Sequence, residues 1–261
     1  AMECYGYLFD KRVEQKDGPG AVLLYRKMGR LGLQDPARLM VCAQMQEKSR
    51  PAEARDNYRS CAQMFLRAGD RERALEALRS VAALEDDNPE AHVRVGELAE
   101  AMGQVEPAGQ SLARAGERLR AGSREGAGER AMALLERAHA LLPADARIAT
   151  VLAAAVMESG DAARVAQLLE PFAAEAAPGR TLLLAEAHLA TGNPGRAEQL
   201  LWPLAPTSPE AQSQLWRLLE SYLRTADREA ALRLLSKLKQ TMFSSRKEEA
   251  FISAVEALSE K

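Results

Sequence analysis

The sequence predicts an all-α protein built as an array of antiparallel helix pairs, and three observations lead to this fold. The chain has 261 residues, of which 47% are apolar and only 5% aromatic. Its apolar residues are mostly alanine and leucine, which favour helices over strands. Turn-forming residues recur along the chain at intervals that are mostly near 34 residues. No segment shows the alternation of apolar and polar residues that a half-buried strand requires.

Eight predicted turns define the repeat, together with apolar residues at fixed distances from them. The turns are Lys16, Ser49, Gly69, Gly103, Gly126, Gly160, Gly192 and Ala226. Five residues after them come Ala21, Ala54, Ala74, Ala108, Ala131, Val165, Ala197 and Ala231. The residues nine and twelve after each turn are all apolar, from Tyr25 and Met28 to Leu235 and Leu238. Because these distances share one helix face, each turn should start a helix whose buried stripe begins with a small residue.

A second helix is predicted before each turn. Seven residues before the turns stand Phe9, Cys42, Ala62, Gly96, Leu119, Ala153, Ala185 and Leu219, which are mostly small and let two backbones approach closely. Asp35-Pro36, Asn88-Pro89 and Ser208-Pro209 each combine a capping side chain with a proline suited to the first helical turn. Pro171 and Pro203 both lie eleven residues after their turns, so the helices predicted at 161–176 and 194–205 should kink or end early.

The turns are 33, 20, 34, 23, 34, 32 and 34 residues apart. A period near 34, with helix-turn-helix units, small residues at fixed places and prolines near unit boundaries, resembles the tetratricopeptide repeat (TPR) family. The resemblance spans Met2 to about Phe243 and implies a right-handed α-solenoid of antiparallel helix pairs, in which the first helix of each pair lines a concave groove. The expected domains are a TPR-like array over residues 1–243 and a capping helix within 244–261, which spans 244–259.

The two short intervals leave room for one helix each. We expect single-helix steps near 51–68 and 105–121, where one helix ends a pair and begins the next, and about fifteen helices in all. This alternation of long and short steps is similar to TPR arrays of bacterial motility and pilus-polarity scaffolds.

Charge and composition limit the kind of partner and the compartment. The 35 basic and 37 acidic residues nearly cancel, so we expect neither nucleic-acid binding nor attraction to anionic lipid. No apolar run is long enough to span a membrane, and the start has no signal-peptide pattern. With three widely spaced cysteines, the expected location is the cytoplasm. An envelope or periplasmic location is the alternative if an export signal lies upstream. The excess of arginine over lysine indicates a bacterial source.

No enzymatic site is predicted. His92, His139 and His188 are isolated from other metal ligands, and the glycine-rich stretch 122–128 lacks both the lysine and the preceding strand of a phosphate-binding loop. Cys42 and Cys61 fall at packing positions and are expected to fill the core. We therefore expect no catalytic residues, no metal and no cofactor.

Protein binding is the predicted function. In a TPR-like array the charged residues Arg59, Arg94, Glu97, Arg217, Glu220 and Arg224 would face the groove. The predicted partner site is Leu182, Leu183, Glu186, Leu189, Trp216, Arg217, Glu220 and Arg224, with apolar anchors and a charged rim. Trp202, beside Pro203, is expected to pack on the convex side. The groove positions of the chaperone-tail clamp hold no lysine or asparagine, which argues against that activity.

The leading hypothesis is a non-enzymatic bacterial scaffold for a protein or peptide partner. Its refinement, from the spacing resemblance, is a motility, type IV pilus or cell-polarity complex with a pilus or motility component or a small Ras-like GTPase as the partner. The rival hypothesis is a TPR protein of envelope or secretion assembly.

Overall fold

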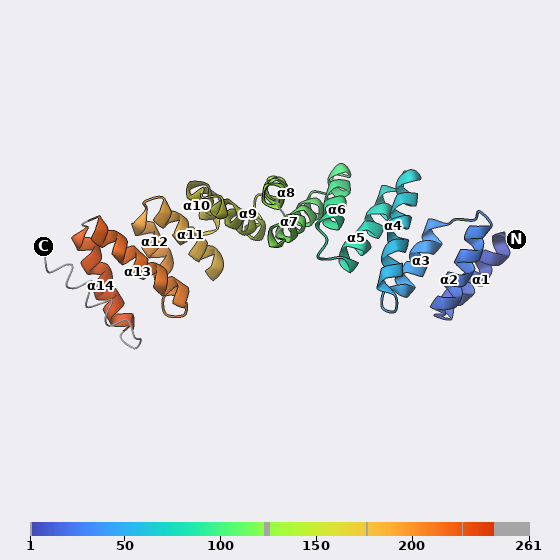
Figure 1. Ribbon diagram of the computed structural model, residues 1–261, viewed down its shortest axis with the longest axis horizontal. Helices are drawn as coiled ribbons and strands as arrows, with labels where there is room; N and C mark the ends of the chain where they lie inside the picture. Colours follow the sequence, from blue (N-terminus) through green and yellow to red (C-terminus); the bar gives the residue numbers. More distant parts are fainter. Residues whose placement is uncertain (1, 123–125, 176, 226, 243–261) are drawn as a thin grey trace. The chain divides into compact units, whose positions relative to one another are not determined.

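The computed structural model describes residues 2–122, 126–175, 177–225 and 227–242, and within them the only regular elements are helices. The capping helix expected at 244–259 and residues 123–125 of the glycine-rich stretch lie outside this part. The chain divides into two compact units, Ala1–Ile148 and Ala149–Lys261, and each is taken by itself. Fourteen α-helices occur in the described ranges (Figure 1).

The first unit contains α1 (Met2–Glu14), α2 (Gly18–Arg30), α3 (Pro36–Gln46), α4 (Pro51–Arg67), α5 (Arg71–Leu84), α6 (Pro89–Ala101), α7 (Val105–Ala121) and α8 (Ala127–Leu141). The unit boundary falls within α9 (Ala146–Glu158). The second unit continues with α10 (Ala162–Leu169), α11 (Pro178–Ala190), α12 (Pro194–Leu201), α13 (Pro209–Arg224) and α14 (Arg228–Met242). From α1 to α8, and again from α10 to α14, each helix packs against the next, as the predicted TPR-like solenoid requires.

Left-handed residues stand at six of the eight predicted turns; Ser49 is not left-handed, and Ala226 lies outside the described residues. Gly69, Gly103, Gly126, Gly160 and Gly192 have φ between 72° and 88°, and Lys16 has φ 55°. After Gly69, the amide of Asp70 donates to the Phe65 carbonyl at 2.9 Å, which closes the helix end in a Schellman-type turn. The Asp70 carboxylate then accepts from the Arg73 amide at 3.1 Å and caps α5. One short segment therefore both ends a helix and starts its partner.

The predicted caps and the predicted proline breaks are both confirmed. The side chains of Asp35, Asn88 and Ser208 accept hydrogen bonds from backbone amides in the first turns of α3, α6 and α13. Helix α10 ends at Leu169 and α12 at Leu201, and each is followed by a 3₁₀ turn that contains the proline, Glu170–Phe172 and Trp202–Leu204. Proline lacks an amide donor and crowds the carbonyl four residues back, so the α-helix cannot continue.

The small residue five positions after each turn is fully buried in every case. The exposed fraction is at most 1% for Ala21, Ala54, Ala74, Ala108, Ala131, Val165, Ala197 and Ala231. The two larger positions of the stripe are also buried in most pairs, but Tyr25 and Leu204 remain half-buried. The periodic stripe thus identifies the helix contacts along both units.

Helices α4 and α7 occupy the positions of the two predicted single-helix steps, and the steps themselves stay a prediction. Helix α4 packs against both α3 and α5, and α7 packs against both α6 and α8. In α7, Ala108 and Leu112 meet Gly96 of α6, while Gly109 and Gly116 turn toward α8. A methyl group on Gly96 would lie 2.7 Å from the Leu112 side chain and 3.4 Å from the Ala108 carbonyl oxygen. Helix α7 is therefore held closely on both sides.

Replacing Gly116 by alanine should destabilise the first unit. Its new methyl group would lie 2.7 Å from Leu135 Cγ and 3.1 Å from the Ala131 carbonyl oxygen, and such overpacking costs about 1–3 kcal/mol. Most of this range exceeds the roughly 1 kcal/mol that alanine gains over glycine in a helix. Gly128→Ala, in open space on α8, is the matched control and should not lower stability. The measurement is the midpoint of urea unfolding followed by circular dichroism, and equal midpoints for the two variants would contradict the close contact.

Candidate functional site

The predicted partner residues of the second unit lie on two helices that touch. The Gln214 side-chain amide of α13 donates to the Leu182 carbonyl of α11 at 3.4 Å, which places the two helices side by side. We call the surface formed by Leu182, Leu183, Glu186, Leu189, Trp216, Arg217, Glu220 and Arg224 the C-terminal face. Its four apolar residues are half-buried and its four charged residues are exposed.

The helical spacing explains this division. Positions 213, 217, 220 and 224 form the exposed stripe of α13, while Leu215, Leu218, Leu219 and Tyr222 on the other side are buried. Trp216 stands between the two stripes and is half-buried. Among the described residues, none of the four charged side chains of this face forms an ion pair. Their charges are therefore available to a partner.

Trp202, the other tryptophan, has a different environment. It opens the 3₁₀ turn after α12 and is half-buried, with the Lys237 ammonium 5.3 Å from its ring centre. Lys237 also donates to the buried Glu198 carboxylate at 2.8 Å. This lysine joins α14 to α12 by an ion pair and a cation–π contact, so Trp202 contributes to packing within the unit.

In the first unit, Arg59, Arg94 and Glu97 line one cavity between α4 and α6. Sequence analysis predicted a groove position for all three. It did not identify Leu66, which lies in the same cavity and is 45% exposed. The signal was present, because Arg59, Gln63 and Leu66 share one helical face beside the buried stripe that contains Tyr58, Ala62 and Phe65.

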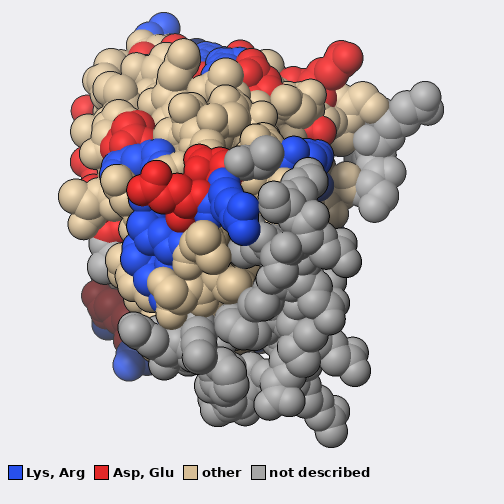
Figure 2. Space-filling model, turned by 90° about the vertical axis from the view of Figure 1, so that its left-hand side faces the viewer, with Lys and Arg blue, Asp and Glu red and all other residues tan. Residues whose placement is uncertain are grey.

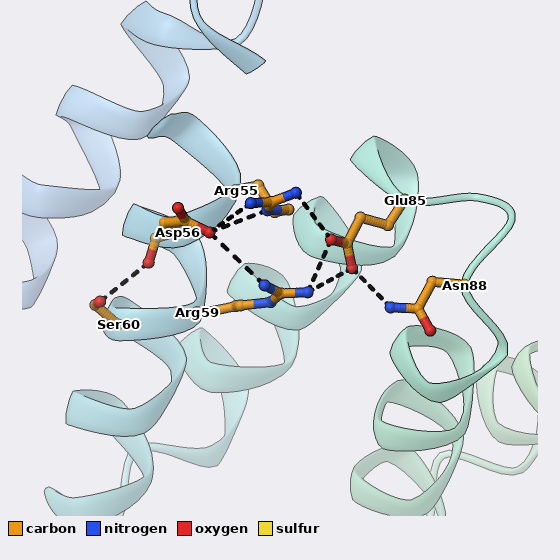
Figure 3. Close-up of polar contacts among 6 residues, drawn as sticks. All are labelled: Arg55, Asp56, Arg59, Ser60, Glu85 and Asn88. Atoms are coloured by element: carbon orange, nitrogen blue, oxygen red, sulfur yellow. Dashed lines mark hydrogen bonds and ion pairs between the residues drawn. The ribbon is translucent and has the colours of Figure 1, made fainter. Parts of the chain in front are cut away.

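A polar cluster fixes Arg59 at the rim of this cavity (Figure 3). Its guanidinium donates to both oxygens of Glu85 at 2.6 and 2.8 Å, and Arg55 Nη1 lies 3.3 Å from the same carboxylate. The Asn88 side-chain amide donates to Glu85 at 2.9 Å, and its oxygen caps α6. Because Glu85 ends α5, the cluster ties α4 to the α5–α6 connection. Arg59 is thereby positioned, but its charge is largely offset.

The three histidines are apart from one another. His92 is buried, and its Nε2 lies 3.0 Å from the Asp86 carbonyl oxygen. The His188 Nε2 lies 2.9 Å from Glu170, whose carboxylate also accepts from Arg196. Burial would raise the pKa of Glu170, but these hydrogen bonds outweigh it and lower the pKa below its ordinary value. In the described ranges no group of His, Cys, Asp or Glu has the arrangement of a metal site.

Surface charge is mixed. The face shown in Figure 2 has Lys or Arg next to Asp or Glu rather than a broad area of one sign. Across helices the same pairing recurs, as in Arg130–Glu90 at 2.5 Å between α8 and α6, which lowers the pKa of Glu90. Among the helices that the structure describes, none is long and apolar enough to cross a bilayer.

Cys42 and Cys61 are core residues, as predicted, and should be chemically protected. Each is at most 1% exposed, and burial raises the pKa of both thiols to about 12. At pH 8 only about one in 10⁴ of these thiols would be the reactive thiolate. Cys4 is exposed. A chromogenic disulfide reagent should therefore react quickly with one thiol of the native chain and with all three after denaturation. Rapid reaction of two or three native thiols would show that the α3–α4 core is open.

Comparison with known proteins returned matches only among solved structures. The sequence matches no family model and no curated protein sequence. MamA of Desulfovibrio magneticus RS-1, residues 41 to its end, is 19% identical, with 74% of this chain and 97% of that chain covered and a TM-score of 0.38. PilF of Pseudomonas aeruginosa is also 19% identical, with 77% and 97% covered and a TM-score of 0.37. A TPR protein of Thermus thermophilus is 18% identical, with 85% and 100% covered and a TM-score of 0.32.

The assignment of the fold rests on the chain's own geometry. Helix pairs joined by left-handed turns, a buried small residue five positions after each turn, and packing of each helix on the next are all present within the units. The chain is an all-α array of tetratricopeptide-like helix pairs.

Proposed function

We propose that this protein is a non-enzymatic scaffold that binds a protein partner through the C-terminal face. One observation supports this function above the others. Four half-buried apolar residues lie on two touching helices. Four exposed charged residues border them and form no ion pair within the described chain. An apolar centre with a charged rim is the composition of a protein interface. A face used only for solubility would not need leucines and a tryptophan in partial contact with water.

The residues have different roles in this proposal. Trp216, Leu182, Leu183 and Leu189 supply the binding energy, because aromatic and aliphatic anchors lose water when a partner covers them. Glu186, Arg217, Glu220 and Arg224 select the partner by charge and speed its approach. Binding to the C-terminal face requires no pronounced cavity, so the ligand can be either a folded protein surface or a peptide.

The narrower form of the proposal is a bacterial, cytoplasmic scaffold in a motility, type IV pilus or cell-polarity complex. What supports it is the spacing of the single-helix steps at α4 and α7. A pilus or motility component and a small Ras-like GTPase are the partners to test first. The alternative is a TPR protein of envelope or secretion assembly. Fractionation of the source cells separates the two, since the first requires a cytoplasmic pool and the second a membrane or periplasmic pool.

Trp216→Ala should weaken partner binding by about 2 kcal/mol, or about thirtyfold, while the helix content stays unchanged. Arg224→Ala should have a smaller effect that disappears at high salt, because it removes a rim charge. The partner is first identified by cross-linking and mass spectrometry from native lysate and is then titrated against each purified variant.

Trp202→Ala is the matched control, since it removes the same side chain from the 3₁₀ turn after α12. It should leave the affinity unchanged, although it should lower stability. If Trp216→Ala keeps the wild-type affinity, the C-terminal face is not the binding site. A loss of helix content in Trp216→Ala would instead make Trp216 a core residue.

A further inference from the structure

Helices α1 and α2 form one end of the first unit and carry a surface that is separate from the C-terminal face (Figure 1). On one side α1 meets α3, where Arg38 lies 3.8 Å from Asp10. On the same side α2 meets α4, where Arg26 lies 3.5 Å from Glu53. The two helices also pack against each other. Their remaining sides turn away from α3 and α4 and face water.

Apolar side chains protrude from this end. Leu8 of α1 is 49% exposed, and Leu23 of α2 and Leu31 at its C-cap are each 56% exposed. Tyr7 is 62% exposed. These are four of the seven large apolar side chains that stand exposed in the described chain. Leu23, Lys27 and Leu31 follow one another at four-residue spacing, which places a lysine between two leucines on one side of α2. We call the surface formed by Tyr7, Leu8, Lys11, Leu23, Lys27 and Leu31 the N-terminal face.

The charges at this end that have no ion pair are nearly all basic. Four exposed residues form no ion pair with a described residue, namely Lys11, Lys16, Lys27 and Arg30. Among the acids of α1 and α2 whose side chains are described, Glu14 alone is in the same state. The Lys11 ammonium lies 5.5 Å from the centre of the exposed Tyr7 ring. The net charge of −2 predicted no attraction to anionic lipid, but it averages over the whole chain, and the local surplus here is positive.

The choice of lysine favours a membrane over a protein as the partner of this face. Four of the eight lysines of the chain lie within residues 11–48, and none lies within 49–236, where arginine is used instead. Protein interfaces are enriched in arginine and depleted in lysine. Lysine next to leucine and aromatic residues is typical of helices that lie on a bilayer. Its flexible stem lets the ammonium reach a headgroup while the neighbouring apolar side chains enter the lipid.

We propose that the N-terminal face docks onto an anionic phospholipid surface. Leu8, Leu23 and Leu31 enter the boundary between headgroups and acyl chains, and the basic side chains contact the headgroup anions. The attachment is peripheral, because none of the helices that the structure describes is long and apolar enough to cross a bilayer. The inference goes beyond the proposed scaffold function, since it concerns other helices and a lipid rather than a protein.

Vesicle flotation of the full chain tests the proposal. One set of vesicles is an equal mixture of phosphatidylserine and phosphatidylcholine, and the other is phosphatidylcholine alone. At low salt the affinity for the anionic vesicles should be at least about tenfold higher than for the neutral ones. Raising the salt should remove most of this difference. No binding to the anionic vesicles, or equal binding to both sets, would overturn the proposal.

Charge reversal then tests the face itself. Lys27→Glu should weaken binding to the anionic vesicles at least about tenfold, because it replaces a cation between two inserted leucines with an anion. Arg114→Glu is the matched control, since Arg114 is exposed on α7 and has no ion pair among the described residues. It changes the net charge equally and should leave binding within about twofold, because a charge away from the contact is screened. Equal losses in the two variants would show attraction by net charge alone and would overturn the site.

The apolar anchors are tested in the same way. Leu23→Gln should weaken binding to the anionic vesicles, whereas Leu232→Gln, which changes a 49% exposed leucine of α14, should not. Circular dichroism checks that both variants keep their helix content. Trp216→Ala should also leave vesicle binding unchanged, which separates this face from the C-terminal face. Sedimentation velocity without vesicles tests the other occupant. Self-association that is lost in Leu23→Gln, in a chain that ignores the vesicles, would assign the face to a second copy and overturn the proposal.

Discussion

The close approach of neighbouring helices is the constraint on which this structure depends. Two helix backbones can touch only where no large side chain stands between them. In the α7–α8 pair, the Ala131 carbonyl lies 3.1 Å from where a Gly116 methyl group would be, and Ala131 itself is 1% exposed. Alanine recurs five positions after seven of the eight predicted turns, with Val165 after the other, so the turn and the contact are set together. At Gly69, Gly103, Gly126, Gly160 and Gly192 a tight glycine turn precedes this residue, and the larger residues of the stripe close the core around the contact.

This constraint also says how the two predicted single-helix steps could be accommodated. A helix can belong to two pairs if both of its sides carry small residues at the right positions. Helix α7 meets this condition, because Ala108 lies next to Gly96 of α6 while Gly109 and Gly116 lie next to α8. The cavity between α4 and α6 lies in the stretch between the two predicted steps, whereas the C-terminal face lies after both.

Local signals made most of the fold predictable from the sequence. Glycine in the left-handed region, a capping side chain before proline, and alanine at a fixed offset each act within a few residues. Pro171 and Pro203 end their helices for the same local reason. The cavity between α4 and α6 was only partly predictable from the sequence. Arg59 and Arg94 could be placed on a helix face. However, the Arg59 charge is neutralised by Glu85, 26 residues away, and the exposure of Leu66 depends on how α6 packs. These contacts between distant residues have no periodic signature. The C-terminal face was predicted from helix periodicity, and its binding role stays a prediction.

The most direct test of the account is native-state hydrogen exchange of the Ala131→Leu variant, which overpacks the α7–α8 contact. Stability in helical arrays is the sum of unit and nearest-neighbour contributions. If α7 is shared between two pairs, the loss of protection should extend from α8 through α7 into α6, while the helices of the second unit from α11 to α14 keep theirs. Reduced protection confined to α8, with α6 and α7 exchanging as in the wild type, would contradict the shared helix and the role of small-residue contacts in building this fold.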